Sequence, residues 1–144
     1  MRLEARIEAL QHGTLFASVP QDDLAVLAES MSEEAFGRDA VVCAAGDPAD
    51  RIYVVMTGSF EVRPAGVEDH RITLRPGDLF GEYGLFDQGL RTATIVAREP
   101  GTLLTLDYGR FRAFLIQFPE AMLAILGTTV GQLLAFQRRL GKPG

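Results

Sequence analysis

The chain has 144 residues, of which 47% are hydrophobic and 23% are charged, and these values fit one globular domain with a full core. A single cysteine, Cys43, excludes an internal disulfide framework and fits the cytoplasm, and its place in an apolar run predicts a small core side chain. The N-terminus is too polar for a signal peptide, and no apolar run looks long enough to cross a membrane. We therefore expect a cytoplasmic protein without membrane insertion.

The charge of the chain argues against direct nucleic-acid binding. Its formal net charge is −5, and no block of Lys and Arg compensates for this. The two histidines, His12 and His70, are too few for a clustered metal site, and no nucleophile stands beside a paired base. We expect neither an enzyme nor a resident cofactor or metal.

Residues 1–31 are predicted to form N-terminal helices. Residues 3–12 place Leu3, Ile7 and Leu10 on one helical face, and a glycine follows. An apolar hook at residues 15–19 leads to Pro20, which is typical of a helix start.

Residues 32–107 change to short β-prone runs separated by Gly, Pro and Asp. Alternation is visible where Phe60 and Val62 are separated by Glu61, and where Ile72 and Leu74 are separated by Thr73. Such lengths and turn signals predict an antiparallel sandwich or jelly roll. The runs are SEEAFG, AVVCAAG, RIYVVMTG, SFEVRP, HRITLRPG, RTATIVA and GTLLTLD.

Residues 108–141 are predicted to form two C-terminal helices. Pro119 separates them, and Gly141 ends the second. The second helix repeats apolar residues in steps of three and four, with one polar interruption at Gln137. This stripe fits packing onto the domain core, and it fits equally a homodimer through residues 119–140. The repeating positions are Leu123, Leu126, Val130, Leu133, Gln137 and Leu140.

The stretch of residues 76–94, PGDLFGEYGLFDQGLRTAT, concentrates groups that suit a phosphorylated sugar. Glycines such as Gly81 and Gly84 allow backbone N–H groups to approach an anion. Arg91 offers a two-pronged donor for phosphate oxygens. Glu82 can accept a hydrogen bond from a sugar hydroxyl but not from a phosphate.

This stretch resembles the phosphate-binding cassette of cyclic-nucleotide-binding domains, the family of catabolite activators, regulatory subunits of cAMP-dependent kinase and cyclic-nucleotide-gated channels. The matching residues are Phe80-Gly81-Glu82, Tyr83-Gly84, Leu85-Phe86 and Arg91-Thr92-Ala93, followed by the strand at 94–97. Leu90 stands where many members have Pro, and Tyr83 is bulkier than the usual aliphatic residue. The segment AAGDPADRIYVVMTGSFEVR also resembles the front half of these domains, so the likeness spans nearly the whole chain.

The resemblance implies an α+β fold, with an antiparallel β-roll flanked by N-terminal helices and two C-terminal helices. It implies that Glu82 takes the ribose 2′-hydroxyl and that Arg91 takes the cyclic phosphate, with Gly81 and the backbone near Arg91, Thr92 and Ala93 completing the phosphate contacts. Tyr83, Gly84 and Leu85 belong to the same binding stretch. A residue between 127 and 136 would cover the base, and either Thr128 or Thr129 could do so, although a helical Thr more often bonds its own backbone.

The implied function is a single sensor domain, residues 1–144, that binds cAMP in preference to cGMP and closes its C-terminal helix over the roll. There is no room after the last helix for a helix-turn-helix, so we expect a parent protein or a separate output domain. A ligand-free dimerisation or interaction module on the same fold is the alternative, with Tyr83 and Phe86 filling the pocket.

Overall fold

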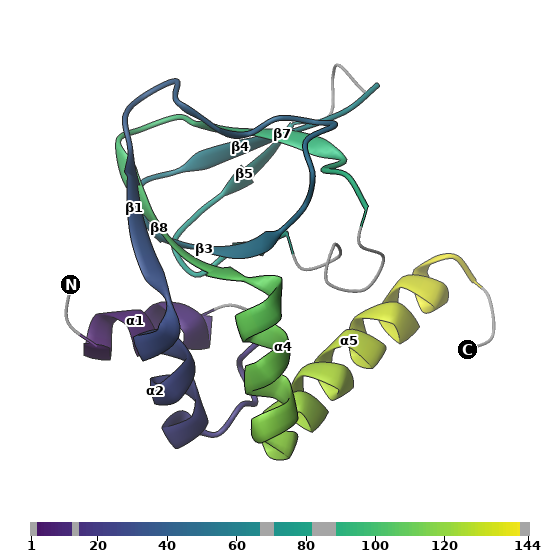
Figure 1. The fold of residues 1–144 in the computed structure, drawn as a ribbon. Helices are drawn as coiled ribbons and strands as arrows, with labels where there is room; N and C mark the ends of the chain where they lie inside the picture. The colour runs from purple at the N-terminus through teal and green to yellow at the C-terminus, as the bar shows by residue number, and fades with distance from the viewer. Residues whose placement is uncertain (1–2, 13–14, 67–70, 82–88, 142–144) are drawn as a thin grey trace.

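The computed structural model describes residues 3–12, 15–66, 71–81 and 89–141, and Figure 1 shows a β-roll standing on a layer of helices. The helices are α1 (Leu3–His12), α2 (Gln21–Ser30), α4 (Tyr108–Gln117) and α5 (Pro119–Arg139). The strands are β1 (Ser32–Phe36), β2 (Val41–Cys43), β3 (Arg51–Thr57), β4 (Phe60–Pro64), β5 (Ile72–Leu74), β6 (Leu79–Phe80), β7 (Ala93–Ala97) and β8 (Gly101–Asp107).

The strands form two antiparallel sheets, in the orders β1-β8-β3-β6 and β2-β7-β4-β5. Every predicted β run contains a strand, and the helices precede and follow the roll as expected. The predicted fold class, an antiparallel roll flanked by N-terminal and C-terminal helices, is therefore confirmed.

Strand β3 joins the two hydrophobic clusters of the domain because it is buried on both faces. Its residues Ile52 and Val54 pack with the helices, whereas Tyr53 and Val55 face the inside of the roll. The alternation of successive side chains produces this division. A displacement of the helices and a displacement inside the roll would therefore both act on β3.

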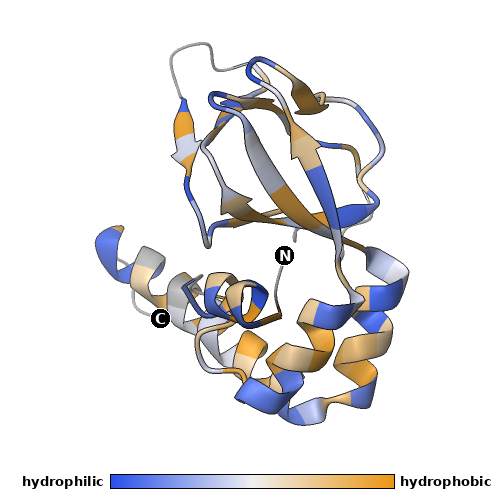
Figure 2. Ribbon diagram, turned by 90° about the vertical axis from the view of Figure 1, so that its left-hand side faces the viewer, coloured by the Kyte–Doolittle hydropathy of each residue, from blue (hydrophilic) through white to orange (hydrophobic). Residues whose placement is uncertain are grey.

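Helix α4 continues directly from β8, and Asp107 caps its start by accepting a hydrogen bond from the Arg110 backbone N–H at 2.7 Å. The ring of Phe111 packs edge-on against Phe16 from the N-terminal hook, with centroids 6.2 Å apart. The hook and α4 are thus fixed to one another. Figure 2 shows the apolar faces of the helices beneath the roll as orange stripes.

Helix α5 is anchored to the core mainly through its first turns, where Ala121 and Ile125 are buried. The apolar members of the predicted repeat are instead exposed, with exposed fractions of 45% to 59%. The exposed members are Leu123, Leu126, Val130, Leu133 and Leu140. The core therefore uses other positions of α5, and these members of the repeat face outward.

By length and composition alone, α5 is apolar enough to cross a membrane, contrary to the expectation that no segment of the chain is. The expectation counted uninterrupted apolar runs, whereas neutral Gly, Thr and Gln residues keep the helix almost free of charge. Only 12% of the qualifying window is buried in the domain. A helix that packs against a protein partner has the same composition as a helix that crosses a membrane.

Candidate ligand site

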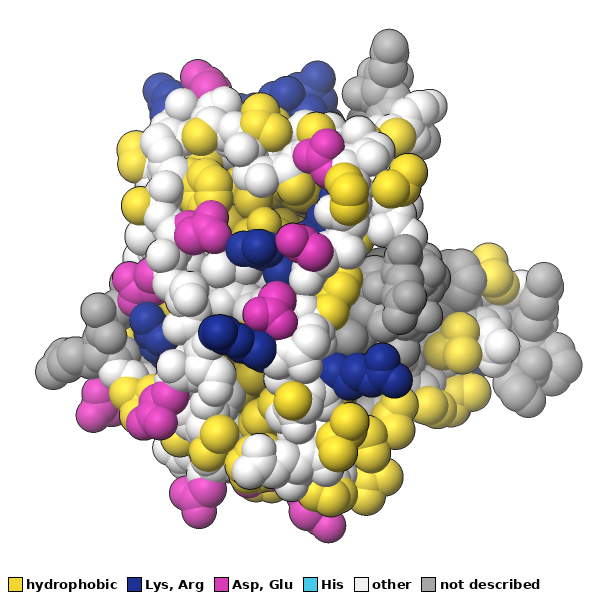
Figure 3. All heavy atoms as spheres, in the orientation of Figure 1, with side chains coloured by type: hydrophobic (Ala, Val, Ile, Leu, Met, Phe, Trp, Pro, Cys, Tyr) yellow, Lys and Arg dark blue, Asp and Glu magenta, His cyan; other side chains and the backbone are white. Residues whose placement is uncertain are grey.

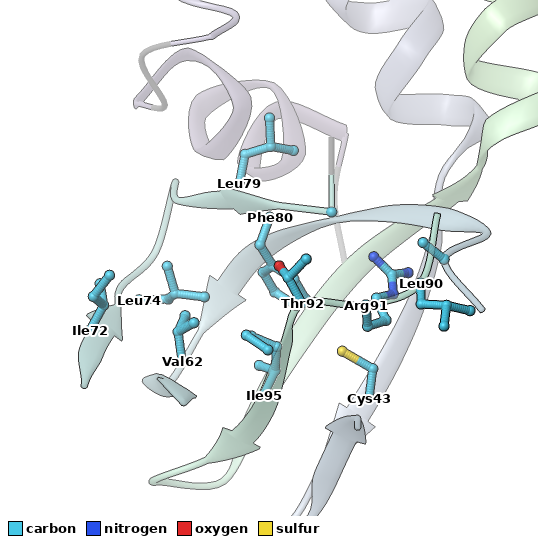
Figure 4. Close-up of a pocket in the computed structure, with 13 residues that line it drawn as sticks. Cys43, Val62, Ile72, Leu74, Leu79, Phe80, Leu90, Arg91, Thr92 and Ile95 are labelled. Atoms are coloured by element: carbon cyan, nitrogen blue, oxygen red, sulfur yellow. The ribbon is translucent and has the colours of Figure 1, made fainter. Parts of the chain in front are cut away.

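A cavity of about 300 Å³ opens into the β-roll between its two sheets. Figure 4 shows Arg91 and Cys43 at one end of it, and Val62, Ile72 and Leu74 at the other. One end is therefore cationic and the other is apolar. The complete lining is Cys43, Ala49, Val62, Ile72, Leu74, Leu79, Phe80, Gly81, Leu90, Arg91, Thr92, Ala93 and Ile95.

Arg91 is the charged residue of this lining, and it is only 9% exposed. Its Nη2 donates to the carbonyl oxygen of Arg51 at 2.9 Å and lies 3.7 Å from a carboxylate oxygen of Asp50. The guanidinium carbon also lies 5.6 Å from the ring centre of Tyr53, within cation–π range. Strand β3 and the segment before it therefore hold this cation at the cavity.

The backbone of Arg91 is fixed by the Gly46-Asp47 turn, one of two Gly-Asp turns in the sequence, the other being Gly77-Asp78. The Arg91 N–H donates to the carbonyl of Asp47 at 2.7 Å, and its carbonyl accepts from the Gly46 N–H at 2.8 Å. A positive φ of 93° at Gly46 allows this turn. The turn thus sets where the guanidinium enters the cavity.

Gly81 stands opposite the guanidinium, with a φ of 91°. A Cβ at this position would lie 2.7 Å from Arg91 Nη1 and 2.7 Å from the Arg51 carbonyl oxygen, so no side chain fits there. The Gly81 carbonyl accepts a hydrogen bond from the hydroxyl of Tyr108, the first residue of α4. The start of the C-terminal helices is therefore bonded to the rim of the cavity.

Cys43 is half-buried, packs against the hydrophobic cluster inside the roll as predicted for a core side chain, and also lines the cavity. The register of β2 against β7 shifts between Val41 and Cys43, an irregularity of the kind a β-bulge makes. Burial raises the pKa of the Cys43 thiol, and the nearby charge of Arg91 opposes that rise. The thiol therefore stays protonated at neutral pH.

Apart from Thr92, the remaining described lining is apolar. Phe80 stacks on Tyr53 with ring centres 4.7 Å apart, and Ile95 packs into the same cluster. Burial also raises the pKa of the Tyr53 hydroxyl, so this ring stays neutral beside Arg91. A flat, apolar group with an anionic end suits such a lining.

The structure brings together four of the predicted site residues, namely Gly81, Arg91, Thr92 and Ala93. The other four, Glu82, Tyr83, Gly84 and Leu85, lie outside the described residues, as does Phe86. The sequence analysis missed Asp50, Arg51 and Tyr53 as partners of Arg91. The one signal for these three residues was that they lie in the segment AAGDPADRIYVVMTGSFEVR, which resembles the front half of cyclic-nucleotide-binding domains.

None of the described cavity-lining residues belongs to α4 or α5. The hydroxyls of Thr128 and Thr129 donate to the backbone carbonyls of Ala124 and Ile125, at 3.1 and 2.9 Å. This agrees with the expectation that a helical Thr bonds its own backbone.

Comparison with known proteins places this geometry in a family. The model of the cyclic nucleotide-binding domain matches residues 33–118. The chain belongs to the cyclic nucleotide-binding domain family. This assignment covers the roll, the two Gly-Asp turns and the cassette, and it extends to the end of α4.

Relatives of this family are similar over most of the chain. The CRP-like cAMP-activated global transcriptional regulator of Mycobacterium tuberculosis is 28% identical over 78% of this chain, and the match covers 52% of that regulator. The cAMP-dependent protein kinase regulatory subunit of Yarrowia lipolytica is 30% identical over 80% of this chain and 30% of the subunit. The chain thus spans about half or less of the length of these curated relatives.

Solved structures give the same assignment. The N-terminal domain of a transcriptional regulator from Streptomyces coelicolor A3(2) superposes with a TM-score of 0.80 and 32% identity, covering 90% of this chain and 95% of that one. The regulatory domain of Toxoplasma gondii PKA, solved with cAMP, has a TM-score of 0.69 and 25% identity, over 78% of this chain and 44% of that one.

The close approach at Gly81 can be tested by substitution. We expect Gly81→Ala to lower the free energy of unfolding more than Gly66→Ala does, measured by urea denaturation. Both glycines have positive φ, at 91° and 77°, so each substitution costs about 1–2 kcal/mol of backbone strain. Only at Gly81 does the added Cβ also collide with Arg91 and Arg51, since nothing lies within 4 Å at Gly66. Equal losses in the two variants would contradict this contact.

Proposed function

We propose that the chain binds a cyclic nucleotide in the β-roll cavity and acts as a sensor, with cAMP favoured over cGMP. The observation that carries the proposal is the buried Arg91 guanidinium at one end of an otherwise apolar cavity. A buried cation favours an anionic partner, and a guanidinium fits phosphate oxygens in a two-pronged geometry. The apolar end then accommodates a base.

Family membership supports the following roles for the cassette residues, and the placement of Arg91 and Gly81 at the cavity agrees with theirs. Arg91, Gly81 and the backbone at Thr92 and Ala93 take the cyclic phosphate, and Glu82 takes the ribose 2′-hydroxyl. Tyr83, Gly84 and Leu85 complete the stretch around the sugar. Relatives named for cAMP support this ligand, although a cGMP-dependent protein kinase of Drosophila melanogaster is also 29% identical. Thr92, beside the phosphate end, can touch a guanine amino group and favours cGMP only weakly.

Ligand binding would shift the C-terminal helices towards the roll, with a residue of α5 between 127 and 136 covering the base. Support comes from the start of α4, where the Tyr108 N–H donates to the carbonyl of Asp50 at 2.9 Å and its hydroxyl bonds the Gly81 carbonyl. The same segments hold Arg91, so a ligand that moves the cation also moves the origin of α4. This is a shift between open and closed populations, with no chemistry on the nucleotide.

The exposed repeat of α5 supports a homodimer through residues 119–140. The apolar side chains recur in steps of three and four along the outward face of one helix, which is the pattern that a second copy of the helix would bury. The net charge of −5 supports a role without direct nucleic-acid contact. The relatives are longer than this chain, which supports a parent or output domain that receives the signal. We propose that the protein acts in the cytoplasm.

Arg91→Leu tests the ligand site. We expect cAMP affinity, measured by calorimetry, to fall roughly tenfold to several hundredfold, because a charge-assisted contact of about 1.5–3 kcal/mol or more is lost. Arg112→Gln, which removes an exposed arginine of α4 outside the cavity, is the matched control and should leave the affinity unchanged. An Arg91→Leu variant that folds and binds as tightly as the parent would contradict the proposal.

A thermal-shift assay separates the sensor from the ligand-free module. A nucleotide at about a hundred times its Kd should stabilise the domain by about 2.7 kcal/mol. Stabilisation by cAMP supports the sensor. The absence of any shift with cAMP, cGMP and cyclic dinucleotides would favour the interaction module.

Glu82→Ala tests the ribose contact. We expect this change to weaken cAMP binding by a factor comparable to that of Arg91→Leu, because the 2′-hydroxyl loses its acceptor. The affinity for 2′-deoxy-cAMP, which lacks that hydroxyl, should hardly change. A Glu82→Ala variant that loses affinity equally for both nucleotides would place Glu82 in a structural role.

Substitutions in the α5 repeat test the homodimer. We expect the parent chain to sediment as a dimer at high micromolar concentration. The double variant Leu126→Glu, Val130→Glu should sediment as a monomer, because the dimer would have to bury two carboxylates per chain between its helices. Ile116→Glu changes an equally apolar side chain, 71% exposed on α4 and outside the repeat, and should leave the dimer intact. A monomeric parent chain would rule this interface out.

A further inference from the structure

A second hollow, of about 430 Å³, lies on the outer face of the sheet β2-β7-β4-β5. Strand alternation separates it from the roll cavity: Val62 and Ile72 line the cavity, whereas their neighbours Glu61 and Arg71 line the outer hollow. The two hollows therefore open on opposite faces of one sheet. The lining of the outer hollow is Arg38, Ser59, Glu61, Arg71, Thr73, Arg75, Arg98 and Glu99.

Glu61 organises the arginines of this hollow. Its side chain is 4% exposed, and its carboxylate lies 2.6 Å from Arg98 Nη1 and 3.2 Å from both Arg71 Nη1 and Arg63 Nε. The hydrogen bond from Arg63, followed by that from Arg98, lowers the pKa of the Glu61 carboxyl. Glu61 therefore remains ionised at neutral pH and holds Arg71 and Arg98 in place before any ligand arrives.

The hollow carries more positive than negative charge. Its described lining contains four arginines and two carboxylates, although the chain as a whole has a net charge of −5. Arg75 forms no ion pair with any described residue. Arg38 also has no carboxylate partner among them, and its Nε donates a hydrogen bond to the Arg98 carbonyl at 3.2 Å. Figure 3 shows basic side chains gathered along the top of the molecule, over this sheet.

We propose that this outer hollow binds an oligophosphate group, which is a ligand that the roll cavity and its family assignment do not involve. Two pre-positioned guanidiniums and two without carboxylate partners among the described residues match the several oxygens of linked phosphates. The Thr73 hydroxyl adds a neutral donor, whereas the Ser59 hydroxyl donates to the Glu99 carboxylate at 3.2 Å. The volume suits a small ligand.

Calorimetry with inorganic pyrophosphate at low ionic strength tests this site. We expect saturable binding at one site per chain, which weakens as salt is added because the contacts are exposed and charged. The double variant Arg38→Gln, Arg75→Gln should bind pyrophosphate roughly tenfold more weakly while keeping the Glu61 ion pairs. Arg112→Gln, which removes a charge from α4 and not from the hollow, should not change the affinity.

Arg91→Leu distinguishes the two hollows, since pyrophosphate binding to the outer hollow should persist when the roll cavity has lost its cation. Amide NMR shifts should then map to Ser59, Thr73 and Arg98. The proposal is overturned if pyrophosphate does not bind, if sulfate binds as tightly, if the double variant binds as well as the parent, or if binding disappears with Arg91→Leu.

Discussion

The burial of one guanidinium is the constraint on which the site depends. Arg91 can be buried only because the backbone around it is satisfied by the Gly46-Asp47 turn, while its side chain donates to the Arg51 carbonyl. Gly81 completes the arrangement by having no side chain. Segments distant in the sequence therefore converge on one cation, and the position of the cation depends on all of them.

Strand β3 connects this cation to the helical layer. Tyr53 lies under the guanidinium, while the adjacent Ile52 and Val54 pack against the helices from the other side of the same strand. The strand is densely packed on both faces, so it moves as a unit rather than yielding locally. Together with the Tyr108 hydrogen bond to Gly81, this provides two physical connections between the cavity and α4.

Sequence patterns predicted the elements well, because strand alternation, glycine turns and helix-ending prolines are local signals. They also placed Gly81 and Arg91 in one cavity, since the cassette is contiguous. They did not predict Asp50 or Tyr53 as partners of Arg91, because these contacts join residues about forty positions apart and no period encodes them. The sequence also did not show that Cys43, predicted as a core side chain, lines the cavity as well, because the irregular register of β2 depends on its neighbour β7.

The anchoring of α5 makes it suited to changes of position. Ala121 and Ile125, near its start, are buried in the core, whereas the repeat from Leu126 onwards is exposed. The hydrophobic cost of moving a helix scales with the apolar area it uncovers, so rotating the distal part of α5 gives up little burial. In the proposed function, a nucleotide or a second copy of the helix would supply this apolar contact. Under the proposed function both would act on the same helix, so occupancy of the cavity and pairing of α5 would be coupled through its position.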